Sequence, residues 1–167
     1  LINYLSEKVN RKIELVQRKT YQEVNNLLES GELDFAFICS GAYVELSSKE
    51  QTDILAVPQS NGKSLYQAYI ITNKKNNITS FGGLKGRSFA FTDPLSNTGR
   101  LYALKRLKEL GENEKTFFSY FVYTNAHDNS IQLVNKGLID GATVDGLIFD
   151  YLKIKSPDKV SNIVVIE

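Results

Sequence analysis

The sequence contains no methionine, one cysteine and one histidine in 167 residues. The single cysteine, Cys39, excludes an internal disulfide and any metal site built from several cysteines. No apolar run approaches the roughly 18 residues that a membrane-spanning helix needs, and no secretory leader is visible. The formal net charge is +1, which provides no broad basic surface for nucleic acid or for an anionic membrane. Any positive field that attracts an anion must therefore be local.

The start of the sequence predicts a fragment. Methionine is absent even from position 1, and the chain opens inside a helical pattern over residues 1–9. An α/β unit normally has a strand before such a helix. We therefore expect that a preceding strand is missing.

Strand-like and helix-like runs alternate along the chain, which is typical of βαβ units with a largely parallel sheet. The predicted strands are 12–17, 33–39, 64–72, 89–92, 117–124, 139–144 and 162–166. The predicted helices are 1–9, 40–48, 99–110, 127–137 and 145–154, with one more that begins after Thr20 and ends at Gly31. Thr20 and Glu23 have the spacing of a capping box there. The polar segment 73–77 is the candidate hinge between two lobes, residues 1–74 and 75–167.

Small polar residues occupy four predicted strand-to-helix turns, at residues 40–41, 96–99, 127–130 and 144–146. In a parallel sheet such turns all lie at the carboxyl ends of the strands, where open α/β folds bind ligands. A helix that starts there offers unpaired amides and the positive end of its dipole. The pattern therefore predicts an anion site.

The turn that ends at Gly99 is the most informative of the four. Ser96, Asn97 and Thr98 supply short donors, and Gly99 lets a ligand approach the first helical turn because it has no Cβ. The alternative is an ordinary helix N-cap followed by a chance glycine. The spacing does not match a P-loop, which ends in Gly-Lys-Ser or Gly-Lys-Thr.

The sole histidine, His127, opens a predicted helix and could donate to an anion held there; the alternative is a surface histidine. No cluster of histidine, cysteine and carboxylate residues has metal-ligand or acid–base spacing, so we expect neither a cofactor or metal nor an enzyme. Asp145 could accept a hydrogen bond from a ligand, although a helix N-cap is the stronger interpretation. Tyr43 and Tyr66 flank turns or strand ends, where tyrosines usually serve in packing.

Three segments of the second half resemble the phosphonate/phosphite/phosphate-binding proteins of ABC importers, which belong to the type II periplasmic-binding-protein superfamily. They read SFAFTDPLSNTG at 88–99, TNAHD at 124–128 and GLIDGA at 137–142. SGELDFAF at 30–37 and LYQAYII at 65–71 fit the same family in the same order. The resemblance implies two α/β lobes with mostly parallel sheets flanked by helices. It also implies a chain truncated at both ends, because family members have a strand before Leu1 and a return segment after Glu167.

The resemblance also implies roles for individual residues. Ser96, Asn97 and Thr98 with their amides would grip the oxyanion, His127 would donate to the same group, and Tyr66 would close from the other lobe. Asn97 stands where the family often has a hydroxyl residue, which would alter individual contacts with the oxygens. The predicted ligand-binding residues are Ser96, Asn97, Thr98, Gly99, His127, Tyr66, Ser40, Tyr43 and Asp145.

The function that the resemblance implies is an extracytoplasmic solute-binding protein that captures a phosphonate, phosphite or phosphate-like oxyanion. We expect a monomer that delivers its ligand to the permease of an ABC importer, with a lipid anchor as one means of retention at the cell surface. The alternative is the ligand-sensing domain of a membrane signalling receptor with the same fold. An enzyme on this fold is disfavoured by the absence of an acid–base pair.

Overall fold

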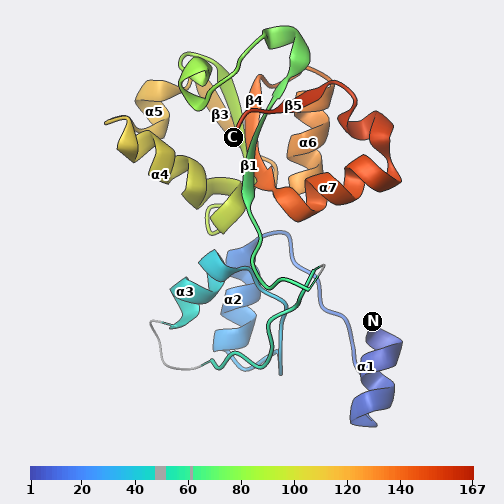
Figure 1. Cartoon of the computed structure of the whole chain (residues 1–167). Coiled ribbons are helices and arrows are strands. Elements are labelled where there is room, and N and C mark those ends of the chain that lie inside the picture. The colour runs from blue at the N-terminus through green and yellow to red at the C-terminus, as the bar shows by residue number, and fades with distance from the viewer. Residues whose placement is uncertain (48–51, 61) are drawn as a thin grey trace.

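Helices and strands alternate in the second half of the chain but not in the first (Figure 1). The structure is a computed structural model that describes residues 1–47, 52–60 and 62–167. Before Ala68, the described residues form three helices and no strand; the helices are α1 (Ile2–Val9), α2 (Tyr21–Glu29) and α3 (Ser40–Ser47). The predicted end of α3 at Ser48 lies outside the described residues. None of the helices in the described ranges is long and apolar enough to cross a bilayer.

The predicted strands at 12–17 and 33–39 are wrong. A strand exists only where a neighbouring strand completes its hydrogen-bond ladder, and no such neighbour lies beside either segment among the described residues. The prediction of a strand covered on both faces also fails for 33–39, because Phe37 is 71% exposed. Apolar composition alone therefore did not determine secondary structure in this half.

The helix predicted after Thr20 is confirmed, and so is its capping box. The N–H of Glu23 donates to Thr20 Oγ1 at 3.3 Å, and the N–H of Thr20 donates to Glu23 Oε2 at 2.8 Å. The helix ends just before Gly31, which has a positive φ of 71° that suits glycine. This local arrangement fixes the direction of the first turn of α2.

The second half contains one five-stranded sheet with the order β3-β2-β4-β1-β5. Its strands are β1 (Ala68–Asn73), β2 (Ser88–Phe91), β3 (Tyr120–Tyr123), β4 (Gly141–Asp145) and β5 (Ile163–Val165). β2 is parallel to β3 and β4, whereas β1 is antiparallel to β4 and β5. The sheet is therefore mixed rather than mostly parallel. The strands that are linked by α-helices run parallel to one another, as the βαβ pattern predicts. β1 and β2 are joined without an α-helix between them, so the pattern does not apply to β1.

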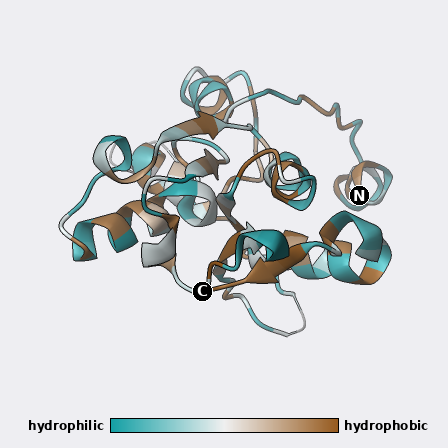
Figure 2. Ribbon diagram, turned by 90° about the horizontal axis from the view of Figure 1, so that it is seen from above, coloured by the Kyte–Doolittle hydropathy of each residue, from teal (hydrophilic) through white to brown (hydrophobic). Residues whose placement is uncertain are grey.

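Helices cover both faces of this sheet (Figure 1). One face carries α4 (Tyr102–Glu109) and α5 (Glu114–Phe117), and the other carries α6 (His127–Asn135) and α7 (Gly146–Lys155). A π-helical turn, η3 (Asn97–Leu101), leads directly into α4, and the short 3-10 helices are η1 (Lys74–Asn76), η2 (Phe81–Leu84) and η4 (Pro157–Val160). The strands are largely apolar, while apolar and polar residues alternate along the helices (Figure 2).

Successive residues of β2 point into two different cores. Phe89 and Phe91 pack on the side of α4 and α5, whereas Ala90 packs on the side of α6 and α7. The Phe89 ring stacks on Phe118, with ring centroids 4.3 Å apart. Because β2 is covered on both faces, all four of its residues are buried, as expected for a central strand in an α/β fold.

The single crossing between the two halves leads into β1 (Figure 1). Ala68–Asn73 pairs with β4 and β5, so these residues belong to the sheet of the second half although they precede residue 75. The predicted hinge at 73–77 contains Asn73, which is 5% exposed and donates to the carbonyl of Val134 at 2.8 Å. The division of the lobes at residues 74 and 75 itself stays a prediction.

From the two cores we predict that replacing a buried aromatic side chain of the sheet costs much more stability than replacing an exposed one. Phe89→Ala should lower the free energy of unfolding by about 3–5 kcal/mol, because it removes a fully buried ring and leaves a cavity. Tyr120→Ala is the matched control, since Tyr120 lies on β3 and is 52% exposed. Urea unfolding of both variants measures the difference, and equal losses would contradict the core described above.

Candidate anion-binding site

The turn from Ser96 to Gly99 is anchored at the carboxyl ends of β2 and β4. Ser96 Oγ accepts from the Gly99 N–H at 2.9 Å, which caps η3. The Thr92 N–H donates to the Gly99 carbonyl at 2.9 Å, and Thr143 Oγ1 donates to the Thr98 carbonyl at 2.6 Å. These bonds hold the backbone of the turn from three sides.

Two backbone donors of this turn are free. Within the described part of the chain, the N–H groups of Asn97 and Thr98 donate to no protein atom. They lie at the start of a continuous helical segment formed by η3 and α4, where unpaired amides and the helix dipole favour negative charge. The turn therefore has the local chemistry of an anion site.

His127 lies beside the same strand ends. Its Nδ1 is 3.1 Å from Thr92 Oγ1 and 3.1 Å from the backbone nitrogen of Asp145. Burial lowers the pKa of His127, while the carboxylates of Asp145 and Asp128 act in the opposite direction. Nε2 has no protein partner in the described residues and is not among their buried, unsatisfied atoms. The ring is therefore held through Nδ1 and leaves Nε2 available.

The first half of the chain meets this turn directly. Asn97 Nδ2 donates to Ser40 Oγ at 3.0 Å, and Ser40 Oγ lies 2.9 Å from the Tyr66 hydroxyl. A Cβ on Gly41 would come within 2.2 Å of the Leu95 carbonyl, so the start of α3 packs tightly against the turn. The structure therefore brings together residues from both halves that the sequence placed in one site.

Two of the predicted ligand-binding residues, Asp145 and Tyr43, are less directly connected to the turn. Asp145 Oδ1 accepts from the Leu147 N–H at 2.8 Å, so Asp145 caps α7 as the simpler interpretation proposed. Its Oδ2 is 3.4 Å from Thr98 Oγ1, which keeps the carboxylate at the edge of the group. Tyr43 is half-buried, and no hydrogen bond described for its side chain connects it to the turn.

Three neighbours of the turn escaped the sequence analysis, namely Tyr21, Thr92 and Asp93. The Asp93 carboxylate is 1% exposed and accepts from the N–H groups of Tyr21 at 3.1 Å and Leu95 at 2.8 Å, which joins the two halves. Burial, reinforced by the nearby Cys39, raises the pKa of Tyr21 to about 12, although a hydrogen bond with Ser96 opposes the shift. Asp93 follows a predicted strand and was detectable in principle, whereas Tyr21 had no signal beyond its place after the capping box.

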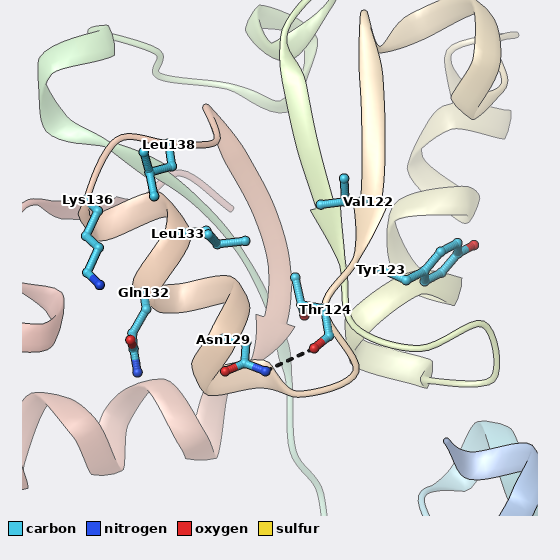
Figure 3. Close-up of a pocket in the computed structure, with 8 residues that line it drawn as sticks. All are labelled: Val122, Tyr123, Thr124, Asn129, Gln132, Leu133, Lys136 and Leu138. Carbon is cyan, nitrogen blue, oxygen red and sulfur yellow. Dashed lines mark hydrogen bonds between the residues drawn. The ribbon is translucent and has the colours of Figure 1, made fainter. Parts of the chain in front are cut away.

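Two surface hollows among the described residues are lined by other side chains than those of this group. The first, of about 340 Å³, is a groove between β3 and α6 (Figure 3). Its lining residues are Val122, Tyr123, Thr124, Asn129, Gln132, Leu133, Lys136 and Leu138. It contains none of the predicted ligand-binding residues. Among the residues that the structure covers, no three histidine, cysteine or acidic side chains are placed to share a metal ion.

The mixed sheet flanked by helices, entered through β1 from the first half of the chain, has the type II periplasmic-binding-protein fold. Residues 1–167 match the family described as the periplasmic phosphonate substrate-binding protein of ABC transporters. The chain therefore belongs to that family. This confirms the resemblance seen in the sequence, and nothing in the comparisons supports the sensor alternative.

Relatives agree with this assignment. The phosphate-import protein PhnD of Mycolicibacterium smegmatis is 28% identical over 166 residues, which cover 93% of this chain and 50% of the relative. PhnD1 from Prochlorococcus marinus (MIT 9301), solved with methylphosphonate, has a TM-score of 0.86 and 20% identity, over 99% of this chain and 63% of that one. A binding protein of a Pseudomonas aeruginosa phosphonate transporter has a TM-score of 0.87 and 18% identity to this chain. The match covers 99% of this chain and 57% of that protein. The chain thus spans about half the length of the Mycolicibacterium smegmatis protein.

The packing of Gly99 generates a prediction for the turn. A Cβ at this position would lie 2.5 Å from Thr92 Cβ and 2.8 Å from Ser96 Oγ. Gly99→Ala should therefore lower the free energy of unfolding by about 1–3 kcal/mol, as overpacked substitutions do. Gly82→Ala is the control, because a Cβ there meets nothing closer than 4.0 Å. Urea unfolding distinguishes the two, and an undamaged Gly99→Ala protein would argue against the close contact with Thr92.

Proposed function

We propose that the protein binds a small phosphorus oxyanion, a phosphonate, phosphite or phosphate, between its two halves. The observation that carries the proposal is the pair of free N–H groups at Asn97 and Thr98, with the available Nε2 of His127 close to the same strand ends. Hydrogen bonds to a charged acceptor are shorter and stronger than neutral ones. Family membership supports the ligand class, and one relative was solved with methylphosphonate.

The proposed contacts divide between the two halves. In the second half, the amides of Asn97 and Thr98 and the imidazole of His127 donate to the oxyanion. In the first half, the hydroxyl groups of Ser40 and Tyr66, which already form a pair at 2.9 Å, approach from the opposite side. Ser96 and Gly99 act through the backbone of the turn, since Ser96 Oγ is occupied by the Gly99 amide.

Opening and closing of the two halves would admit and release the ligand. Among the described residues, the polar contacts that join the halves near the turn are few: the Tyr21 N–H to Asp93, the Tyr21 side chain to Ser96, Ser40 to Asn97, and Cys39 Sγ to the Leu95 carbonyl at 3.6 Å. Such a small set of polar contacts is compatible with hinge motion around one crossing segment. A bound oxyanion would add bonds to both sides and so favour the closed arrangement.

In the cell, the proposed role is delivery of the oxyanion to the permease of an ABC importer by an extracytoplasmic monomer. The family description, a periplasmic substrate-binding protein of an ABC transporter, supports this location and this partner. The same description names binding rather than catalysis, and we propose that the protein itself catalyses no reaction. Attachment through a lipid anchor, and any contribution of Tyr43 or Asp145 to ligand contacts, stay predictions.

Isothermal titration calorimetry with methylphosphonate, phosphite and phosphate tests the proposal. At least one should bind, and His127→Ala should weaken that binding by about 1–3 kcal/mol, the range for a lost hydrogen bond to a charged group. Tyr66→Phe should also weaken binding, because it removes the hydroxyl group that we propose contacts the oxyanion and leaves the ring in place. Lys136→Ala is the control, since this cation lines the groove between β3 and α6 instead.

Failure of all three anions to bind the wild-type protein would refute the proposed ligand class. Loss of affinity in Lys136→Ala, with none in His127→Ala, would move the site to the groove of Figure 3. Unchanged affinity in both His127→Ala and Tyr66→Phe would show that the assigned residues are wrong even if an anion binds.

A further inference from the structure

Thr92 and the backbone of Asp145 meet the same nitrogen of the only imidazole in the chain. Both lie 3.1 Å from His127 Nδ1. A backbone N–H can only donate, so Nδ1 must present its lone pair to Asp145. In a neutral imidazole with an accepting Nδ1, the proton is on Nε2. The fold therefore selects one of the two tautomers.

The hydroxyl of Thr92 reinforces this selection. Thr92 is 0% exposed, and Oγ1 has no other hydrogen-bond partner among the described residues. Because Nδ1 accepts from the Asp145 N–H and carries no proton, the Thr92 hydroxyl can only be the donor in its contact with Nδ1, and the two donors share the lone pair of Nδ1. Removal of this hydroxyl would leave the Asp145 N–H as the sole protein donor to Nδ1 among the described residues and would weaken the restraint on the ring.

Charge at this imidazole is disfavoured by the same contacts. A second proton would have to go onto Nδ1, which would then point a donor at the Asp145 N–H. The carboxylates that act on the ring are Asp145, at the end of β4, and Asp128, in the first turn of α6. Their attraction for a proton is outweighed by burial, and the pKa of His127 is lowered from its ordinary value of 6.5. Because the pKa of His127 lies below 6.5, the neutral ring is the major form at pH 6.5 and above.

We propose that Thr92 is a positioning residue that, together with the Asp145 amide, holds His127 as a neutral Nε2–H donor aimed at the oxyanion. The ligand part of this inference rests on the proposed function; the tautomer does not. The imidazole would then contribute an oriented hydrogen-bond donor to the oxyanion rather than a positive charge. Binding would depend on how well the ligand oxygens match fixed N–H and O–H donors, and not on an imidazolium formed in acid.

Nitrogen NMR of the protein labelled with ¹⁵N-histidine tests the tautomer without any ligand, since His127 gives the only histidine signals. At pH 7, the wild-type protein should show a protonated Nε2 and an unprotonated, hydrogen-bonded Nδ1. Thr92→Val should shift the Nδ1 resonance toward that of a free acceptor, and Thr92→Ser should restore it. A proton on Nδ1 or an imidazolium at pH 7 would overturn the inference.

Thr72→Val is the matched control. Thr72 is also 0% exposed and lies in β1 of the sheet whose strand β2 precedes Thr92, but its hydroxyl donates to the Asp140 carbonyl at 2.6 Å, away from His127. This variant should lose stability and leave both imidazole resonances unchanged. If Thr92→Val also leaves them unchanged, Thr92 has only a structural role and the inference is wrong.

Methylphosphonate titrations of the same variants test the positioning role. Thr92→Val should bind about tenfold more weakly than wild type, Thr92→Ser should recover most of the loss, and Thr72→Val should bind normally. Normal affinity in Thr92→Val would overturn the positioning role. If the wild-type tautomer is as expected but no anion binds, the proposed function fails while the assignment of the Nε2–H tautomer stands.

Discussion

Thr92 connects the turn from Ser96 to Gly99 to the imidazole, and the geometry of the candidate site depends on this connection. Its N–H donates to the Gly99 carbonyl, its Oγ1 meets His127 Nδ1, and its side chain fills the space where a Cβ at position 99 would lie. Because one fully buried residue makes all three contacts, the free amides of the turn and the ring keep a fixed relation. Pre-positioned donors of this kind bind an anion without first reorganising.

The residues assigned to the candidate site include no lysine or arginine side chain. Its donors are backbone amides, hydroxyl groups and an imidazole for which the neutral form is favoured by burial. The buried carboxylate of Asp93 lies close by, yet both its oxygens accept backbone N–H groups. This agrees with a chain of nearly balanced charge, in which the field that attracts an anion must come from helix starts and oriented dipoles.

Sequence patterns predicted the second half better than the first. The strands of the mixed sheet and helices α4, α6 and α7 appear close to their expected positions, because buried apolar runs, caps and glycines are local signals. Helix α5 was not predicted, and its last residue, Phe117, was assigned to the strand that follows. The segments 12–17 and 33–39 carried similar apolar signals and form no strand, since a ladder needs a partner that local sequence cannot supply. The antiparallel direction of β1 was not predicted for a related reason. Whether two strands pair parallel or antiparallel depends on which strands become neighbours in the folded sheet.

The sequence by itself determined the family, the turn with its small donors, and the prominence of the only histidine, because these are carried by residue identity and order. Tertiary structure alone decided which N–H groups stay free, which nitrogen of His127 is occupied, and that Tyr21 and Asp93 join the halves beside the turn. Asp145 shows the difference most clearly, since its backbone rather than its carboxylate holds the imidazole. A backbone contact leaves no trace in side-chain chemistry, so only the folded chain can reveal it.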